Sequence, residues 1–273
     1  MSPDEFQFFA DFLRERSGIS LDAGKEYLVE ARMTTVLSDY EFASLSTLIV
    51  TLRSGSDPAL EDRVVEEMTT NETSFFRDHQ PFEELKELVI PTLIETRGTE
   101  KKLHIWSAAC SAGQEPYSIA MLIKEHFPEL ADWTLSIIGT DLSEAALEKA
   151  RKGSYSQLET NRGLPPELLT KYFTRSGVRW QINDEIREMV EFRKLNLLEP
   201  ITGLPVADVV LVRNVLIYFE QALKQETLAK IRGVMDPSSY LFLGGAETTL
   251  QVDDQLVRVS DRPRTSCYQL RKD

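Results

Sequence analysis

The sequence predicts an α/β protein: a doubly wound parallel sheet with a small N-terminal all-α domain and a small antiparallel β insertion. Three observations predict this fold class. Apolar residues recur at helical spacing over residues 1–70. Apolar runs alternate with amphipathic stretches from about residue 101, and this alternation stops between Gly153 and Val190. The predicted units are a helical domain (1–70), a linker with a connecting helix (71–100) and a sheet domain (101–273) whose insertion covers about 155–190.

The first 70 residues predict a small group of helices. Their apolar positions lie mostly three or four residues apart, with short polar breaks between three sets: Phe6, Phe9, Ala10 and Leu13; Leu28, Ala31, Val36 and Leu37; Leu45, Leu48, Ile49 and Leu52. This segment has 6 basic and 14 acidic side chains, a net charge of −8. Such a charge is more often a solvated surface than a binding device.

Six apolar runs predict the strands of the sheet: 103–109, 135–139, 190–195, 209–212, 240–243 and 266–270. The helices between them have recognisable ends. Ser143 is a predicted N-cap with Gly153 at the C-terminal position, and Pro116 lies in the first turn of a helix ending at Phe127. We expect these helices to cover both faces of the sheet. The alternating residues Val178–Ile182 predict a strand of the insertion.

Composition excludes several classes of protein. With 273 residues, 42% hydrophobic and 27% charged, the chain is neither disordered nor fibrous. Its 31 basic and 44 acidic residues give a net charge of −13, the wrong sign for holding nucleic acid or anionic lipid.

The cysteines and the N-terminus indicate the cellular compartment, and the histidines indicate whether a metal site is expected. Two cysteines far apart, Cys110 and Cys267, favour a reducing compartment, and we expect a cytoplasmic protein. The acidic N-terminus lacks a basic region, and no apolar run approaches the roughly 20 residues of a membrane span, so we expect neither export nor insertion. The three histidines show no close pairing, and we expect no metal.

The first candidate site is the predicted strand before Cys110, which leads through Ser111–Gly113 to a helix from Glu115. Small residues allow close approach of a ligand at the carboxyl end of a parallel strand, where open α/β sheets bind nucleotides. The segment lacks the full G-x-G-x-x-G pattern and a Gly-Lys-Ser/Thr sequence, which disfavours phosphate binding. The alternatives are that the small residues serve packing alone and that Glu115 only favours the helix dipole.

Polar residues also follow three later strands. Asp141 ends the second strand, where a carboxylate is the usual partner of ribose hydroxyls; the alternative is that it caps the helix near Ser143. Asn196 and Leu197 suit the edge and face of a purine, and Arg213, Asn214 and Tyr218 line a predicted cleft. A purely structural Arg213 would need a carboxylate partner, because a buried unpaired arginine is costly.

The segment NETSFFRD (71–78) lies at the predicted seam between the two domains. Its polar and aromatic residues suggest a role at the site. The alternative is that Thr70, Asn71 and Thr73 cap the following helix and that Phe75 and Phe76 belong to the core.

Taken together, NETSFFRD, WSAACSAGQEPYS (106–118), GTDLS (139–143), KLNLL (194–198) and RNVLIYF (213–219) resemble the chemotaxis receptor methyltransferases, the CheR family. The ordered set spans nearly the whole chain and is far more specific than any single member. The resemblance implies a Rossmann-like class I methyltransferase that uses S-adenosylmethionine to methylate glutamate side chains of chemoreceptors. The products would be glutamyl methyl esters and S-adenosylhomocysteine, and the partners the receptors' cytoplasmic domains.

The resemblance also assigns roles to residues of this chain. It implies cofactor contacts by nine residues: Asn71, Thr73, Arg77, Glu115, Asp141, Asn196, Leu197, Arg213 and Asn214. It places Arg77 and Tyr218 beside the transferring methyl as catalytic residues. A glutamate of pKa about 4.3 is ionised at pH 7 and needs no general base, which agrees with a motif set lacking histidine. Opposite charges are neutralised during the displacement, so a partly dry cleft favours it.

Two departures from the family concern receptor docking. Family members resemble one another in a basic face on the N-terminal domain, whereas residues 1–70 here have a net charge of −8. A local cluster of Lys25 and Arg32 is the remaining candidate for charge-guided docking. Members that bind a receptor's C-terminal pentapeptide have a longer, glycine-containing loop in the β insertion, while Thr174–Val178 is short here, so we expect no pentapeptide tether.

Two other functions stay open from the sequence. One is a methyltransferase of another carboxylate or of a small molecule. The other is a non-catalytic signalling module that binds S-adenosylmethionine, against which intact Arg77 and Tyr218 argue.

Overall fold

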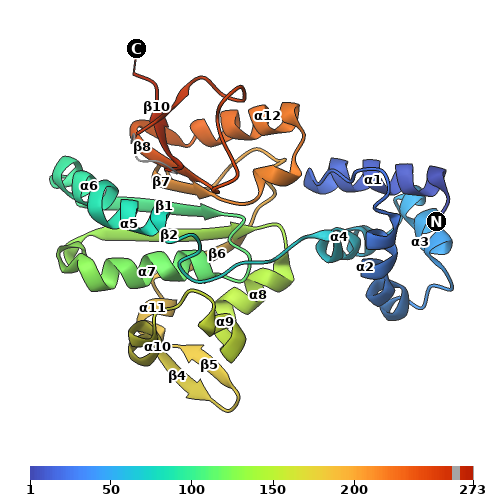
Figure 1. The fold of residues 1–273 in the computed structure, drawn as a ribbon, viewed down its shortest axis with the longest axis horizontal. Coiled ribbons are helices and arrows are strands. Elements are labelled where there is room, and N and C mark those ends of the chain that lie inside the picture. The colour runs from blue at the N-terminus through green and yellow to red at the C-terminus, as the bar shows by residue number, and fades with distance from the viewer. Residues whose placement is uncertain (260–264, 273) are drawn as a thin grey trace.

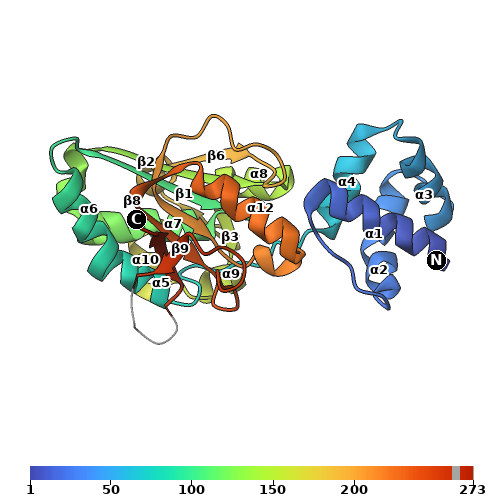
Figure 2. The same ribbon diagram turned by 90° about the horizontal axis from the view of Figure 1, so that it is seen from above.

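The computed structural model describes residues 1–259 and 265–272, so the predicted end of the sheet domain, Asp273, lies outside it. The chain forms two lobes (Figure 1): the helices α1–α4, and a sheet with helices on both faces. Figure 2 shows the two lobes side by side. No helix within the described ranges is long and apolar enough to cross a membrane.

The N-terminal lobe consists of α1 (Pro3–Ser17), α2 (Glu26–Asp39), α3 (Leu45–Ser54) and α4 (Pro58–Met68). Side chains of Ser2, Ser44 and Asp57 accept backbone N–H bonds at three of the helix starts, which satisfies donors that a helix leaves free. The predicted helices are confirmed, with one correction. In α2 the buried residues are Val29, Met33 and Val36, whereas Ala31 is exposed.

The reason for this correction is that α2 has apolar residues on two neighbouring stripes. Val29, Met33 and Val36 repeat at i, i+4 and i+7, and Val36 belongs to the predicted set as well. Contact with α4 and α3 selects this stripe, and sequence spacing alone does not distinguish the two.

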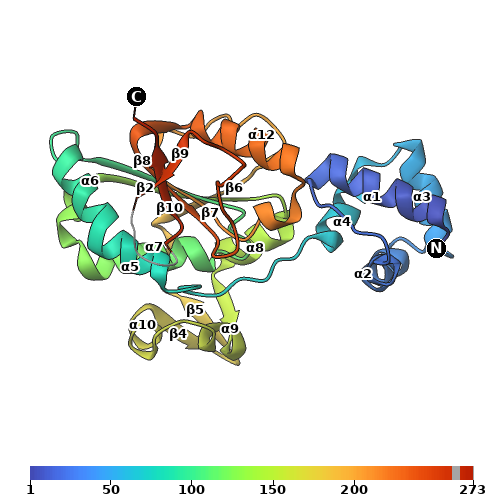
Figure 3. The same cartoon turned by 45° about the horizontal axis from the view of Figure 1, so that its top comes forward.

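A linker leads from α4 to the second lobe and enters α5 (Gln80–Glu84), the π-helical turn η1 (Leu85–Val89) and α6 (Ile90–Arg97). Figure 3 shows it passing from α4 to α5 along the side of the sheet lobe. Phe75 and Phe76 are buried in the main core, as the alternative interpretation predicted for them.

The main sheet has the order β6-β2-β1-β7-β8-β10-β9. The first five are parallel, β10 runs antiparallel to its neighbour β8, and β9 pairs antiparallel with β10 and so runs in the direction of the first five. The strands are β1 (Lys102–Ala108), β2 (Thr134–Asp141), β6 (Val190–Lys194), β7 (Ala207–Val212), β8 (Met235–Leu243), β9 (Leu256–Arg258) and β10 (Cys267–Leu270). The doubly wound sheet is confirmed. The sequence pattern does not predict β9, an edge strand of three residues.

The strand order predicts where a ligand-binding crevice lies in the sheet. The chain runs outward from β1 to β2 and β6 and then returns to β7 on the other side of β1. Open α/β sheets bind ligands at such a switch point, outside the carboxyl ends of the strands.

Helices cover both faces, as predicted. On one face α7 (Gln114–His126), α8 (Glu144–Lys152) and the α5–α6 segment pack in one core with Ile105 and Ile137. On the other face α12 (Gln221–Arg232) packs with Trp106 and Val210. Two 3-10 turns, η2 (Pro128–Asp132) and η3 (Leu216–Tyr218), complete the connections.

The predicted β insertion is confirmed and projects away from the sheet (Figure 1). It forms a three-stranded antiparallel sheet in the order β3-β5-β4. Phe75 of the linker packs edge-on against Tyr155 and Phe173 of the insertion. Its elements are β3 (Ser154–Ser156), α9 (Gln157–Asn161), α10 (Pro166–Tyr172), β4 (Phe173–Ser176), β5 (Arg179–Ile182) and α11 (Asp184–Arg187).

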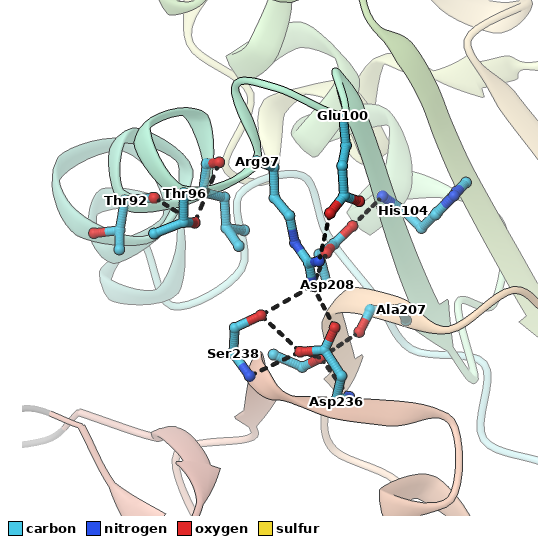
Figure 4. Close-up of polar contacts among 11 residues, drawn as sticks. Thr92, Thr96, Arg97, Glu100, His104, Ala207, Asp208, Asp236 and Ser238 are labelled. Carbon is cyan, nitrogen blue, oxygen red and sulfur yellow. Dashed lines mark hydrogen bonds and ion pairs between the residues drawn. The ribbon is translucent and has the colours of Figure 1, made fainter.

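Arg97 forms a charged cluster at the amino ends of the strands (Figure 4). Its guanidinium contacts Asp208 of β7 at 3.1 Å, Asp236 of β8 and the hydroxyl of Ser238 at 2.9 Å. Asp208 also accepts a 2.7 Å hydrogen bond from the backbone N–H of His104 in β1. The cluster joins α6 to three strands at the edge opposite the crevice.

The two lobes meet at the carboxyl ends of the strands. The backbone N–H of Ser20 donates to the carbonyl of Tyr218 at 3.0 Å. Glu66 of α4 accepts 2.9 Å bonds from the hydroxyl of Ser143 and the N–H of Ala145 at the start of α8. Gly18 ends α1 with φ of 76°, where an added Cβ would lie 2.8 Å from Phe219. The N-terminal lobe therefore closes over the crevice.

Candidate functional site

A cavity lies at the carboxyl ends of the parallel strands, between the sheet and the N-terminal lobe. It contains about 950 Å³ of space free of atoms, part of which is open to solvent. The linker, the β1–α7 loop, the ends of β2, β6 and β7, and the end of α1 line it. All ten predicted site residues are among its lining: Asn71, Thr73, Arg77, Glu115, Asp141, Asn196, Leu197, Arg213, Asn214 and Tyr218.

The β1–α7 loop has an unusual backbone. Ala109 and Ser111 have φ of 52° and 51°, values that cost non-glycine residues energy and that cluster at functional sites. Gly113 has φ of 86°, and a Cβ there would lie 2.8 Å from the Cβ of Ala150 in α8. The small residues thus serve packing, as the alternative held, and also allow the turn that points the Ser111 N–H at the next strand.

Asp141 is held by backbone donors on both oxygens. Its Oδ2 accepts from the N–H of Ser111 at 2.7 Å and its Oδ1 from the N–H of Ser143 at 2.9 Å. Burial raises the pKa of Asp141 above its ordinary value, although these bonds act in the opposite direction. The carboxylate therefore makes the helix-end contact of the alternative interpretation and also lines the cavity as a fixed acceptor.

Arg213 has the carboxylate partners that its burial requires. Its side chain is 2% exposed and contacts Glu115 and Asp78, each at 2.7 Å. The same guanidinium donates to the carbonyl of Arg77 at 2.9 Å, and Ser107 donates to the other oxygen of Glu115 at 2.7 Å. Arg213 thus fastens the linker to the ends of β1 and β7. It has this structural role and also lines the cavity.

Arg77 and Tyr218 line the cavity with few protein partners. Among the described residues, the Arg77 guanidinium makes one hydrogen bond, at 2.9 Å to the carbonyl of Glu72. The Tyr218 hydroxyl makes none with those residues. Both side chains are half-buried and keep donors available to a ligand.

The capping alternative for the linker is wrong. Helix α5 begins at Gln80, and no side chain caps it. Thr70 instead accepts a hydrogen bond from Arg32, and Asn71 donates to the hydroxyl of Thr69 at 3.1 Å. The carbonyl of Asn71 accepts from the Ser111 hydroxyl at 3.0 Å, which ties the linker to the β1–α7 loop.

Asn196 at the end of β6 has part of its amide bonded within the protein. Its Nδ2 donates to the carbonyl of Arg16 in α1 at 2.8 Å, and its Oδ1 accepts from the N–H of Leu198 at 3.0 Å. Leu197 is buried and also lines the cavity. The pair therefore offers an apolar surface and an amide that the N-terminal lobe orients.

The basic residues of the N-terminal lobe are engaged within the protein. Arg32 donates to the carbonyls of Glu67, Met68 and Thr69, where it completes the end of α4, and Lys25 pairs with Asp22 at 2.9 Å. The other four basic side chains of residues 1–70, Arg14, Arg16, Arg53 and Arg63, also contact acidic, carbonyl or aromatic groups. The docking cluster suggested for Lys25 and Arg32 therefore has no free guanidinium.

Sequence reasoning missed several contributors. Ser17 and Ile19 line the cavity from the end of α1, about 50 residues before the linker, and nothing in their local sequence indicates it. Ser107 and Ser111 lie within the stretch of small residues, for which the sequence predicts only a close approach of the backbone to a ligand. In the structure their hydroxyls donate hydrogen bonds that orient Glu115 and the linker. A group of three or more metal-ligating side chains does not occur among residues 1–259 and 265–272.

Comparison with known proteins agrees with this architecture. Residues 71–264 match the family model "CheR methyltransferase, SAM binding domain" and residues 4–69 match "CheR methyltransferase, all-alpha domain". Relatives include chemotaxis protein methyltransferase 1 of Pseudomonas aeruginosa, 42% identical, and chemotaxis protein methyltransferase Cher2 of Pseudomonas putida, 40% identical, with 95% of both chains covered in each case. A chemotaxis protein methyltransferase of Vibrio parahaemolyticus is 37% identical over 96% of both chains.

These matches cover both lobes in order, and the match over residues 71–264 spans the linker and the sheet lobe. S-adenosylmethionine is the cofactor of the matched sheet domain. The cavity fits it, because it combines a fixed carboxylate acceptor in Asp141, apolar surface at Leu142 and Leu197, and charged groups at Arg77 and Glu115. The chain belongs to the CheR methyltransferase family.

Proposed function

We propose that this protein transfers the methyl group of S-adenosylmethionine to glutamate side chains of chemoreceptors, with glutamyl methyl esters and S-adenosylhomocysteine as products. The observation that carries the proposal is that Arg77 and Tyr218 line the same cavity as Asp141 and have donors that bond to no described residue. The names of the relatives, chemotaxis protein methyltransferases, support the receptor as substrate.

The cofactor, when bound, supplies a methyl group on a positively charged sulfur. We propose that Asp141 binds its ribose hydroxyls, that Leu197 and Asn196 contact its base, and that Asn71, Thr73, Glu115 and Asn214 complete its binding with Arg213. The acceptor glutamate is already ionised at neutral pH, so the chain's task is positioning rather than removal of a proton.

Arg77 and Tyr218 divide the positioning of the acceptor between them. A full bidentate grip by Arg77 would orient the acceptor carboxylate but would also draw charge from the attacking oxygen. We propose that Arg77 binds one carboxylate oxygen and that Tyr218, a neutral donor, binds the other. Ser17 and Ile19 of the N-terminal lobe line the cavity, and we propose that this lobe reduces the access of water on its side, which would favour a displacement that neutralises charge.

The short β4–β5 connection supports a tether-independent mode of receptor recognition. Ser176 pairs directly with Arg179, so that only Gly177 and Val178 form the turn. We propose that a receptor's C-terminal pentapeptide is not bound there. Titration calorimetry with such a peptide is expected to show no tight binding, and a micromolar or tighter complex would contradict the proposal.

We further propose that residues 1–70, 71–100 and 101–273 act as a docking lobe, a cavity-lining connector and a catalytic domain. The matched ranges 4–69 and 71–264 support the first of these two boundaries. The proposed place of action is the cytoplasm, where receptor cytoplasmic domains lie and where the two free cysteines would stay reduced.

The experiment is methyl transfer from tritiated S-adenosylmethionine to a chemoreceptor cytoplasmic fragment. The expected result is label on the receptor that base releases as methanol, the signature of a carboxyl methyl ester. Label on another molecule would favour the alternative carboxyl methyltransferase. No transfer despite cofactor binding would favour a non-catalytic module, and either result would refute the proposal.

A further inference from the structure

Glu247, which does not line the cavity, accepts an unusual number of backbone hydrogen bonds from the segment that does. Its Oε2 accepts from the N–H groups of Asn214 at 2.8 Å and Gly244 at 2.6 Å. Its Oε1 accepts from those of Val215 at 3.0 Å and Ile217 at 3.2 Å. One half-buried carboxylate thus satisfies four main-chain donors, three of them in the five residues between Arg213 and Phe219.

These donors belong to a segment that has no regular partner of its own. The chain leaves β7 after Val212, Asn214 adopts φ of 60°, and η3 is a single 3-10 turn. Backbone N–H groups at such a point need an acceptor, and a positive φ persists only where the surroundings impose it. In this structure Glu247 is the acceptor for Asn214, Val215 and Ile217.

The neighbouring backbone is shaped to admit this carboxylate. An added Cβ on Gly244 would lie 2.7 Å from Glu247 Oε2 and 2.8 Å from both the backbone and the side-chain nitrogen of Asn214. A side chain at position 244 would therefore push the end of β8 away from the segment. The close approach of β8 to Asn214 is part of the same arrangement.

The segment that Glu247 holds carries part of the proposed catalytic machinery. Asn214, Val215 and Tyr218 all line the cavity, and Arg213, directly before them, fastens the linker that bears Arg77. A displacement of about 1 Å at such groups can cost about 100-fold in rate.

We propose that Glu247 is a positioning residue: its carboxylate fixes the Asn214–Tyr218 segment in the conformation that binds the cofactor and presents Tyr218 to the acceptor. The cofactor part of this inference rests on the family's cofactor, and the catalytic part rests on the proposed function. Glu247 itself contacts neither ligand.

The test variant is Glu247→Gln. The amide keeps the size of the side chain but replaces one oxygen with an NH2 group, which then faces two N–H donors instead of accepting from them. We expect S-adenosylhomocysteine to bind about tenfold more weakly by calorimetry. We expect kcat for receptor methylation to fall by about 100-fold while KM for the receptor changes little.

The matched control is Glu159→Gln in the insertion. Glu159 is also half-buried and also accepts a backbone N–H, that of Ser156 at 2.8 Å, but it lies outside the cavity lining. Its variant is expected to bind S-adenosylhomocysteine and to methylate receptor like the wild type. An equal loss in both variants would overturn the specific role of Glu247.

Hydrogen exchange separates positioning from general stabilisation. In Glu247→Gln the amides of Asn214, Val215 and Ile217 should exchange faster, while those in β1 and β2 keep wild-type rates. Uniform acceleration with unchanged ligand affinity of the folded fraction would make Glu247 a stability residue only, and would overturn the proposal. So would wild-type affinity and kcat in the folded variant.

A second variant, Glu247→Asp, keeps both acceptor oxygens but withdraws them by one methylene. It is expected to be folded and to lose affinity in the same direction by a smaller factor, so the test does not depend on the folding of Glu247→Gln alone. The two proposals fail differently: wild-type protein that binds S-adenosylhomocysteine but methylates no receptor refutes the proposed function, whereas the affinity comparison still decides the role of Glu247.

Discussion

Arg213 and Arg97 form similar charged clusters at opposite edges of the same sheet. The Arg213 guanidinium pairs with two carboxylates and the Arg97 guanidinium with three, and each has a buried Nε without a hydrogen-bond partner among the described residues. Their surroundings differ. Arg213 joins the linker to strand ends that line the cavity, whereas Arg97 joins α6 to the starts of β7 and β8 (Figure 4).

The difference teaches that arginine–carboxylate ion pairs can serve two purposes in one protein: one cluster arranges the site, and the other stabilises the fold. At the carboxyl edge, Arg213 lines the same cavity as Ala109, Ser111 and Asn214. These three residues have positive φ, so the backbone around this cluster is irregular. At the amino edge the cluster connects regular helix and strand ends. Removing either guanidinium should destabilise the protein, but only one removal should disturb the site.

The largest effect is expected from Arg213→Met. It leaves Glu115 and Asp78 without their partner, and breaking a buried ion pair in this way costs about 3–5 kcal/mol. The free energy of unfolding, measured by urea denaturation, should fall by that amount. Calorimetry on the folded fraction should show loss of S-adenosylhomocysteine binding, and retained binding would contradict the link between this cluster and the site.

The matched variant Arg97→Met should lose stability without losing binding. Its side chain is 19% exposed, so we expect a smaller loss of about 2–3 kcal/mol in the free energy of unfolding at pH 7. The affinity for S-adenosylhomocysteine should stay at the wild-type value. A weaker affinity in the folded variant would break the distinction between the two edges.

The same variant has a predicted pH dependence. Burial raises the pKa of Asp208 in the wild type, while Arg97 opposes the rise, so removal of Arg97 should raise this pKa further. A carboxyl whose pKa is raised by folding favours the folded state when protonated, and this contribution is lost as pH rises through the folded-state pKa. The stability difference between Arg97→Met and wild type should therefore shrink from pH 7 to pH 5, and a larger difference at pH 5 would contradict this reasoning.

Arg77→Ala tests a cavity-lining side chain of the linker that Arg213 fastens. Methyl transfer should fall by about two orders of magnitude, the scale of a lost positioning contact. The protein should stay folded, because the guanidinium makes only one hydrogen bond with the described residues. Near-normal ester formation by this variant would remove Arg77 from the mechanism.

The smallest effect concerns salt. Because the six basic residues of the N-terminal lobe have partners within the protein, receptor docking through this lobe should not depend on long-range attraction. The methylation rate should change by less than about twofold between roughly 0.05 and 0.5 M salt, a range over which exposed charges become strongly screened. A tenfold loss at high salt would restore charge-guided docking.

Much of this arrangement follows from local sequence. Strands with apolar runs and helices with clear ends, such as Ser143 to Gly153, are predictable because their signals lie within the element itself. Residues at the carboxyl ends of parallel strands, such as Asp141 and Arg213, are predictable as neighbours because the topology brings those ends together.

The rest depends on contacts that no local pattern encodes. Ser17 reaches the cavity because α1 packs on Phe219, and Arg32 completes the end of a helix more than 30 residues away. Glu247 lies in a loop without periodicity, and its role becomes visible only from the four donors around it. Val29 rather than Leu28 faces the core because neighbouring helices choose between two equivalent stripes.

The most direct measurement is a crystal structure of the protein with S-adenosylhomocysteine bound. We expect the ligand to lie between the linker and the ends of β1, β2, β6 and β7, with its ribose hydroxyls on Asp141 and its sulfur facing Arg77 and Tyr218. A ligand bound elsewhere, or one in this cavity with its ribose turned away from Asp141, would contradict the account.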